Sequence, residues 1–428
     1  MKTQRSPLVF IFLTVFIDLL GVGIVLPLLP FYVKLIEATS PAWMSTNHAL
    51  IVGALTASYS LFQFLCTPVL GALSDRFGRR QVLLFSLMGT AFAYVLFGLA
   101  DRFTPLGAEA VLAVLFVARI TAGSTGGSIS TAQAYIADVT TPETRARGLG
   151  MIGAAFGLGF MLGPAIGGLL SSVSLSAPAF AAAALTVANV IFGYFKLPES
   201  LPAERRSERL ASINPLRRLS AVVGRQSIRP LLAGVLLLNL AFASMQSNFA
   251  VFSAARFGYG PTQIAFIFAF IGVMAVLMQG FLLRKLVPLF GEARLAVTGM
   301  ALMSAGFVLV ASVPTAWLLY PAVGVIAIGS SMANPNLTSL ISRRVSSREQ
   351  GSVLGGTQAL TSLTMVIGPL VSGLLFDKVG QAAPYLTGAL LIAGAASVLF
   401  VALRPEFGGR VVVRQPLPLR SEFELSGD

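Results

Sequence analysis

Residues Gly71 to Arg80 read GALSDRFGRR, and they place one Asp, three Arg and two Gly at the junction between two hydrophobic segments. One apolar segment ends in this stretch, and another begins at Gln81. The stretch is therefore predicted to form a tight, charge-dense loop, with a turn at 76–78, between two helices of membrane-spanning length.

The composition of the 428 residues excludes a water-soluble globular domain. Hydrophobic residues make up 55% and charged residues only 11%, whereas soluble domains carry about 25% charged residues. Apolar stretches long enough to cross a bilayer recur along the whole sequence. They predict an all-α membrane protein with twelve transmembrane helices. The predicted spans are 8–33, 48–73, 81–100, 107–129, 147–170, 178–197, 230–254, 263–288, 294–312, 315–338, 352–375 and 382–403.

The net charge of +13 comes from basic residues whose positions indicate the topology of the chain in the membrane. Of the 30 basic residues, Lys34, Arg102, Arg256 and Lys378 lie in connections on one side, and Arg119 lies within a span. The rest occupy the alternate connections and both tails. By the positive-inside rule, a multi-pass protein of the cell (cytoplasmic) membrane is predicted, with both termini in the cytoplasm. Its surroundings are the lipid bilayer, and nucleic acid is excluded as a partner.

The sequence indicates that the chain consists of two related halves. Gly163-Pro164 recurs as Gly368-Pro369 at an offset of 205, and Gly280 to Arg294 is a fainter copy of the opening stretch with most charges lost. Two related bundles imply a binding site between them near the bilayer midplane. The predicted divisions are an N-terminal six-helix bundle (1–197), a cytoplasmic linker with an amphipathic basic segment (198–229), a C-terminal six-helix bundle (230–403) and a disordered cytoplasmic tail (404–428).

Four stretches carry a resemblance to a known family. GALSDRFGRR resembles the signature loop of the major facilitator superfamily, and RITAGSTGG from Arg119 resembles its fourth-helix motif, with Ala122 where that motif often has Gln. GLGFMLGPAIGG at 157–168 resembles the fifth-helix motif of the drug/proton antiporter branch. FIDLLGVGIVLPLLP at 16–30 resembles the first helix of tetracycline-resistance-type exporters.

Asp18 and Arg119 are the candidate proton-coupling residues. An ionised Asp at mid-depth in a span costs at least ~2.5–3.5 kcal/mol, so it is expected to face an interior cavity and to have a partner. Arg119, likewise deep in a helix and permanently charged, is the candidate partner. The alternative is a static buried ion pair that only fixes helix packing.

The opening stretch is interpreted as a cytoplasmic gate. Asp75 is expected to lie against a helix N-terminus of the other half, where the helix dipole favours an anion. Arg79 is expected to reach Asp138 at the end of the fourth helix. The alternative is a solvated loop whose charges serve only topology. The candidate gate residues are Gly71, Asp75, Arg76, Gly78, Arg79, Arg80 and Asp138.

The fifth span carries a glycine face that permits close helix approach. The local sequence is also compatible with generic packing of small residues. The resemblance implies that this face acts as the hinge of an antiporter. Its members are Gly159, Gly163, Pro164, Gly167 and Gly168.

Amide and aromatic side chains within the spans are the candidates for a substrate cavity. Amides in a bilayer also bridge helices, at ~0.6 kcal/mol on average. No second-half span has a charged residue near its centre, so recognition of a strongly anionic substrate would rest on Arg119. The candidates are Tyr59, Gln63, Asn239, Phe242, Gln246, Gln279, Asn334 and Gln358, with Asn336 as a further amide.

Taken together, the residues and the resemblance predict a proton-coupled antiporter that exports amphipathic organic compounds or drugs by alternating access. The coupling ion is the proton, and we expect no cofactor, metal or catalytic residue because no GxxxxGK[ST] phosphate loop, nucleophile–base pair or metal cluster is present. The predicted partner is a small amphipathic organic substrate, and the predicted oligomeric state is a monomer. The alternatives are a sugar exporter, a lipid translocase, or a non-transporting membrane receptor or scaffold.

Overall fold

The computed structural model describes residues 7–37, 40–206, 224–346 and 349–404. Within these ranges the chain is almost entirely helical and contains no strand. In this described part of the chain, twelve helices are long and apolar enough to cross a membrane. The predicted all-α fold with twelve transmembrane helices is therefore confirmed, and the chain is an integral, multi-pass membrane protein.

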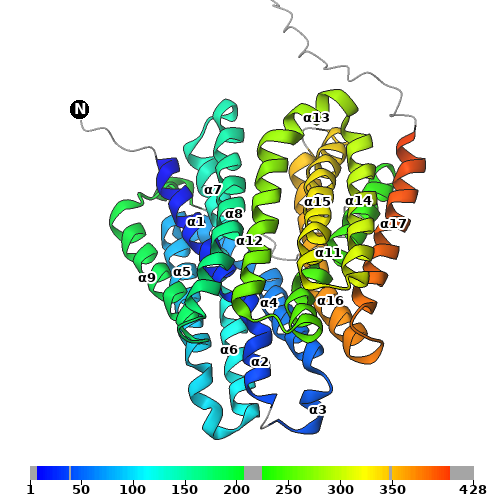
Figure 1. Ribbon diagram of the computed structural model, residues 1–428. Helices are drawn as coiled ribbons and strands as arrows, with labels where there is room; N and C mark the ends of the chain where they lie inside the picture. The colour runs from blue at the N-terminus through cyan, green and yellow to red at the C-terminus, as the bar shows by residue number, and fades with distance from the viewer. Residues whose placement is uncertain (1–6, 38–39, 207–223, 347–348, 405–428) are drawn as a thin grey trace, which may run out of the picture.

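The first six spans lie mainly on the left of Figure 1. The first is built of α1 (Pro7–Val25), η1 (Leu26–Leu28) and α2 (Leu29–Leu35), and a short α3 (Ala42–Ser45) follows. The next five are α4 (His48–Phe77), α5 (Arg79–Leu99) with η3 (Ala100–Leu106), α6 (Ala108–Thr125) with α7 (Ser128–Val139), α8 (Pro142–Leu170) and α9 (Ala177–Lys196). Of these elements, α3 and α4 extend below the second half in the figure.

The second six spans form the other side of the molecule. They are α11 (Arg229–Phe257), α12 (Pro261–Leu277) continued by the π-helix η6 (Met278–Leu282) and α13 (Leu283–Phe290), α14 (Glu292–Ser312), η7 (Ala316–Leu318) with α15 (Leu319–Arg343), α16 (Gln350–Lys378) and α17 (Ala383–Leu403). Between the halves, the described ends of the linker contain η4 (Ala203–Arg205) and η5 (Gln226–Ile228).

The junction between α4 and α5 is shorter than the predicted loop. Most of the stretch from Gly71 to Arg80 is helical, and Gly78 alone separates the two helices, so the three-residue turn at 76–78 is wrong. Gly78 has φ +106° and ψ 151°, a conformation open to glycine because it has no Cβ. The charged residues before it simply continue the helix beyond the apolar part of the span.

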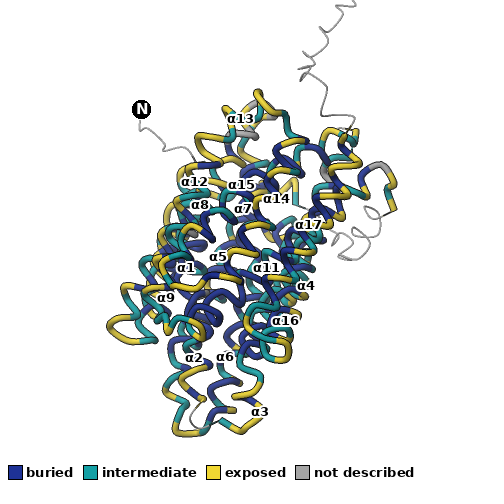
Figure 2. The backbone as a smooth tube through the Cα atoms, turned by 45° about the vertical axis from the view of Figure 1, so that its right-hand side comes forward, coloured by how far each residue is buried: buried dark blue, intermediate teal, exposed yellow. Residues whose placement is uncertain are grey.

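Each half encloses its own apolar core. Tyr32 and Phe97 are fully buried in the first half, and Phe307 and Tyr385 in the second. Figure 2 shows buried residues along the middle of the molecule and exposed residues along its outer helices. Large apolar side chains on that outer surface, such as Leu390, suit a lipid environment rather than water.

We name the two ends of the molecule by the linker. The "linker side", at the top of Figure 1, is where α4, α9 and α13 end, and the "opposite side" carries α3. Residues 207–223 of the predicted linker (198–229) and residues 405–428 of the predicted tail lie outside the described residues. Arg225 Nη2, near the linker's end, lies 2.8 Å from Glu349 Oε1. Hydrogen bonds from Arg225 and Ser346 lower the pKa of Glu349 to about 2.

The halves meet mainly through two helix pairs, α4 with α16 and α8 with α12. Small residues permit the approach: a Cβ added at Gly53 of α4 would overlap the carbonyl oxygen of Pro369 of α16. Likewise, a Cβ added at Gly272 of α12 would lie 2.7 Å from the Cα atom of Met161 of α8. Both pairs therefore pack backbone against backbone.

Candidate functional site

Asp18 lies in the buried polar interior of the first half. Its side chain is on α1, the residue is 6% exposed, and its Oδ2 accepts a hydrogen bond of 2.5 Å from Ser128 Oγ. Ser128 is itself buried and is the first residue of α7. Asp18 thus has the inward orientation expected for an acid within a span, with a hydroxyl as its partner.

The fourth span is interrupted beside Asp18. α6 ends at Thr125 and α7 begins at Ser128, with Gly126-Gly127 between them. The first N–H groups of α7 therefore have no partner within their own helix, and the helix dipole favours a negative charge at this end. The sequence predicted one continuous helix over 107–129; the pair of glycines was the signal for a break. The broken helix presents its N-terminal end to the Asp18 carboxyl group.

Arg119 does not pair with Asp18, so the predicted ion pair is wrong for this structure. No salt bridge within 4 Å joins the two side chains. The guanidinium of Arg119 instead lies over the Tyr59 ring, 4.5 Å from its centroid, and Nε donates to the Leu55 carbonyl at 3.3 Å. A cation–π contact and a carbonyl satisfy this buried cation in place of an acid.

Gln63 links the Arg119 contact to the helix break. Its Nε2 donates to Tyr59 Oη at 3.1 Å and to the Gly126 carbonyl at 3.2 Å. The second bond satisfies a carbonyl freed by the interruption, which is necessary in water-free surroundings. Arg119, Tyr59 and Gln63 thus form one network that ends two residues before Ser128.

Arg79 is the centre of an ion-pair cluster on the linker side. It is 9% exposed and lies 2.5 Å from Asp75 Oδ1 and 3.1 Å from Asp138 Oδ2, and it donates to Ser74 Oγ at 2.6 Å. The predicted contact between Arg79 and Asp138 is present. Asp75 pairs with Arg79 one turn along the chain, rather than with a helix N-terminus of the other half, because Arg79 is the first residue of α5 and is within reach.

Glu199, at the start of the linker, completes this cluster and was missed by the sequence analysis. Its Oε1 accepts from the Arg79 backbone N–H at 2.8 Å, and its Oε2 from that of Arg80 at 3.2 Å. It thereby caps the N-terminus of α5, where a carboxylate is favoured. A Cβ at Gly78 would overlap the Glu199 carboxylate, so this glycine also makes room for the cap.

The remaining predicted gate residues lie at the edge of the cluster. Arg80 donates to the Tyr194 carbonyl and lies over the Tyr194 ring, 5.4 Å from its centroid. Arg76 is exposed and lies over the Phe77 ring. Gly71 has open space where a Cβ would be. These three residues do not join the ion pairs of Arg79.

The second half carries one ion pair at the corresponding position, with acid and base exchanged. Gly291 has φ +80° and precedes Glu292, the first residue of α14, as Gly78 precedes Arg79. Glu292 Oε1 lies 2.9 Å from Arg343 Nη2 and accepts from Ser339 at 2.9 Å. Arg343 follows Asp138 by the offset of 205 that relates the halves. The copy judged from sequence to have lost most charges therefore keeps an ion pair, with acid and base reversed.

The glycine face of α8 packs against α1 beside Asp18. A Cβ added at Gly159, Gly163 or Gly167 would lie between 2.6 and 2.9 Å from atoms of residues 19–24. Pro164 lies within α8 and touches the same stretch of α1, through the space beside Gly23. The face therefore fixes the distance between α8 and the helix that carries the buried acid.

Gly168 extends this packing to the other half. A Cβ added there would overlap Ala265 of α12, and Thr262 Oγ1 donates to the Gly168 carbonyl at 3.0 Å. One helix, α8, thus contacts both α1 and α12. The same motif that packs against the helix of Asp18 also holds part of the boundary between the halves.

The comparison with known sequences shows to which family the chain belongs. The sequence profile of the Major Facilitator Superfamily matches residues 11–355 and, in a second match, residues 280–421. The chain belongs to the major facilitator superfamily. The resemblance inferred from its motifs is confirmed.

Relatives of this facilitator are tetracycline and multidrug resistance proteins. Tetracycline resistance protein, class C, of Escherichia coli is 37% identical over 399 residues, covering 93% of this chain and 96% of that protein. Multidrug resistance protein 2 of Bacillus subtilis is 27% identical, covering 87% and 90%. The crystal structure of the human organic anion transporter MFSD10 (TETRAN) is similar with a TM-score of 0.69 and 27% identity, covering 93% and 100%. The facilitator is a transporter and not an enzyme.

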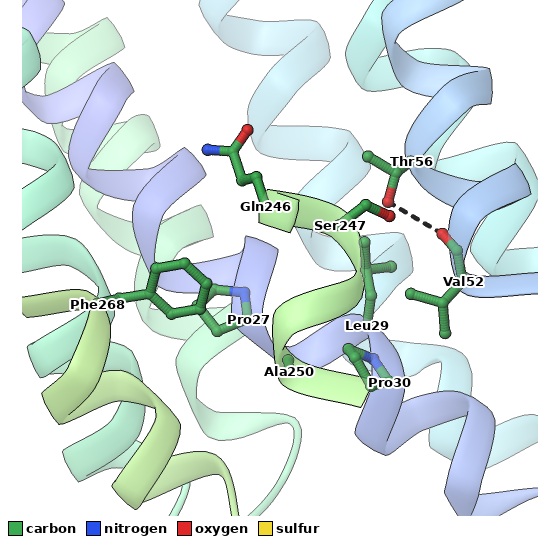
Figure 3. A pocket seen from close by; sticks show the side chains of 9 residues that line it. All are labelled: Pro27, Leu29, Pro30, Val52, Thr56, Gln246, Ser247, Ala250 and Phe268. Carbon is green, nitrogen blue, oxygen red and sulfur yellow. Dashed lines mark hydrogen bonds between the residues drawn. The ribbon is translucent and has the colours of Figure 1, made fainter. Parts of the chain in front are cut away.

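A small pocket lies between the halves of the facilitator (Figure 3). Of the predicted cavity residues, Gln246 alone lines it. Its wall is mainly apolar, and the polar groups are an amide and two hydroxyls. The lining residues are Pro27, Leu29, Pro30, Val52, Thr56, Gln246, Ser247, Ala250 and Phe268.

The other predicted cavity residues of the facilitator fall into separate groups. Asn239 Nδ2 lies 3.5 Å from Asn334 Oδ1 and donates to the Val235 carbonyl at 2.8 Å. Gln279, in the π-helix, donates to Ser331 Oγ at 3.3 Å. These amides bridge or brace helices, the alternative role weighed for them.

Three further candidates complete the set. Phe242 packs against the apolar core of the second half. Asn336 donates to the Met332 carbonyl one turn earlier in α15. Gln358 is exposed on α16. The structure thus does not gather the predicted cavity residues of this facilitator around one pocket.

Proposed function

We propose that the protein is a proton-coupled antiporter that exports amphipathic organic compounds by alternating access, in the cell membrane with both termini cytoplasmic. The observation that carries the proposal is the buried Asp18 carboxyl group, held by Ser128 at the N-terminal end of a broken transmembrane helix. A carboxyl group in this setting can hold or release a proton, and both forms have a local partner, since Ser128 can donate or accept.

The names of the relatives support drugs as the substrate class. The tetracycline resistance proteins of classes C and G are 37% and 32% identical over most of the chain. Arg119 lies within the first half without an acidic partner within 4 Å. An acidic group on a substrate would give Arg119, which is now held by the Tyr59 ring and the Leu55 carbonyl, an anionic partner. The apolar wall of the pocket, which Arg119 does not line, suits an aromatic or polycyclic skeleton. Tetracycline is accordingly the first substrate to test.

One proton supplies enough free energy for useful export. A membrane potential of 100 mV contributes about 2.3 kcal/mol per charge, and one pH unit contributes about 1.4 kcal/mol. For a neutral substrate the sum supports a concentration gradient of roughly a few hundred-fold per proton. The proposal requires no cofactor, metal or nucleotide hydrolysis.

Efflux from cells, with and without a proton uncoupler, tests the proposed function. We expect cells that express the protein to accumulate less tetracycline, and an uncoupler to restore accumulation. Export that persists in the presence of the uncoupler would refute proton coupling. Export of sugars or labelled lipids instead of drugs would favour the alternative substrate classes. The absence of any transport by the reconstituted protein would favour a receptor or scaffold.

The ion-pair cluster of Arg79 is proposed to act as the cytoplasmic gate. It joins the end of α4, the end of α7 and, through Glu199, the start of the linker. All of these segments belong to the first half or to the start of the linker, so movement of one of them against the others lengthens these bonds. The cluster therefore favours one arrangement of the linker side, without contacting substrate.

Asp75→Ala is expected to slow export about two- to fivefold without changing substrate preference. The substitution removes the partly exposed carboxylate that pairs with Arg79, and such pairs contribute about 0.3–1 kcal/mol. Initial export rates for several substrates measure the effect. Glu204→Gln, which removes an exposed carboxylate from the linker side, is the control and should leave the rates unchanged. A shifted substrate profile in Asp75→Ala would argue against a purely conformational role.

A further inference from the structure

The carboxylate of Asp377 bridges the two halves on the opposite side of the molecule. Asp377 lies at the end of α16, next to its last residue. Its Oδ1 accepts from the backbone N–H of Ala49 at 3.2 Å, and its Oδ2 from that of Leu50 at 2.8 Å. Both acceptor bonds cross from the second half to the first turn of α4.

This carboxylate supplies the cap that α4 does not provide for itself. Asn47 is the N-cap residue, but its side chain makes no capping bond and donates instead to the Trp43 carbonyl at 2.6 Å. The first N–H groups of a helix need an acceptor, and the helix dipole favours an anion there. Asp377 meets both requirements from the other half. When this side is closed, the carboxylate binds the first N–H groups of α4; when it opens, these groups must bind water or another partner.

The helices around Asp377 are shaped for this contact. A Cβ added at Gly373 of α16 would lie 2.6 Å from the Ala49 carbonyl oxygen and 2.6 Å from the Leu50 Cα atom. One turn further into the span, Gly53 of α4 gives the same close approach to Pro369. The glycines bring α16 near enough for the carboxylate to reach the end of α4.

The two helices also have related ends. They run antiparallel: α4 begins on the opposite side and ends on the linker side, and α16 does the reverse. Each carries an Asp near its C-terminal end, Asp75 in α4 and Asp377 in α16. In this structure Asp377 contacts the other half, whereas Asp75 is bound to Arg79 within its own half.

We propose that Asp377 is the latch of a gate on the opposite side. Its capping of α4 keeps this side closed, and the two hydrogen bonds must break when the side opens. The proposal rests on the proposed function in one respect, that the transporter alternates between two arrangements of its halves. Release exchanges two charge-assisted hydrogen bonds for hydration of Asp377 and of the first turn of α4. The latch therefore sets the ratio of the closed to the open form of this side.

The distance between the halves on this side tests the proposal. Spin labels at Leu106→Cys and Trp317→Cys report it, since both positions are exposed on the opposite side and belong to different halves. Cys66 is replaced by Ser in all variants, so that only the introduced thiols are labelled. The full-length protein in lipid nanodiscs is measured by pulsed electron resonance, with folding checked by gel filtration and thermal unfolding.

Asp377→Ala is expected to raise the ratio of the long-distance to the short-distance population at least tenfold. Asp377→Glu, which keeps the charge, should return most of the short-distance population. Glu109→Gln removes an exposed carboxylate from the first turn of α6 on the same side and is the matched control. Unchanged distances in Asp377→Ala, or an equal change in Glu109→Gln, would overturn the latch.

A second variant covers the case in which Asp377→Ala does not fold. Gly53→Ala leaves the carboxylate intact but places a methyl group against Pro369, and it should also increase the long-distance population. No increase in a folded Gly53→Ala protein would count against closure at this contact. The measurement uses neither substrate nor proton gradient, so failure of drug export and failure of the latch are separate results.

Discussion

Asp18→Asn is expected to abolish proton-driven export while leaving folded protein in the membrane. The amide keeps the shape of the side chain and can still accept a hydrogen bond from Ser128, but it cannot take up or release a proton at any physiological pH. Without that exchange, a membrane potential or pH gradient has no means of acting on the substrate cycle. Uptake of tetracycline into inverted vesicles driven by an imposed pH gradient measures the loss, which we expect to exceed a hundredfold.

Two comparisons make this result specific. Ser128→Ala removes the hydrogen bond to Asp18 but keeps the titratable group, so we expect slower, still uncoupler-sensitive export. Substrate binding by Asp18→Asn, measured on purified protein, should be retained, since a coupling residue is not required for occupancy. Undiminished gradient-driven uptake by Asp18→Asn would remove Asp18 from the mechanism.

Gly163→Leu is expected to abolish export through a loss of packing. A Cβ at this position would lie 2.8 Å from the Cα atom of Gly23 and from the Leu20 carbonyl oxygen, so a leucine has to push α8 away from α1. Overpacking of this kind costs about 1–3 kcal/mol or more, and here it acts on the helix that carries Asp18. Export and the midpoint of thermal unfolding should both fall, whereas Gly163→Ala should give an intermediate effect on each.

The same helix provides a control for Gly163→Leu. Gly153 lies on α8, and a Cβ added there would have no neighbouring atom within 4 Å. Gly153→Leu should therefore change neither export nor the unfolding midpoint by a comparable amount. Normal export by Gly163→Leu would show that α8 and α1 do not need to stay in contact.

The number and order of the spans could be predicted from sequence because hydrophobicity is a property of the chain read in one dimension. The contact of Arg79 with Asp138 could be predicted as well, since both charges lie at span ends on one side. The turn at Gly78 was predicted too long because charged residues at a helix end do not show whether the helix continues. In each case the prediction used only hydrophobicity and charge along the chain, without knowledge of how the helices pack.

The partners of the buried groups could not be predicted in the same way. Arg119 was expected to bind the nearest acid at its depth, but the rotation of α6 places it over Tyr59 instead. Ser128 is one of many small polar residues in the sequence, and only the packing of α1 against α7 distinguishes it. Glu199 was taken as part of the linker, because nothing local indicates that it returns to the start of α5.

The exchanged charges of the two ion-pair clusters bear on how the repeated halves assemble. In the first half the base begins α5 and the acid ends α7; in the second the acid begins α14 and the base ends α15. Pairing a segment with the wrong copy during synthesis would set Arg79 against Arg343, or Glu292 against Asp138. Like charges repel in both mismatches, so the reversed signs disfavour exchange of these segments between the two similar bundles.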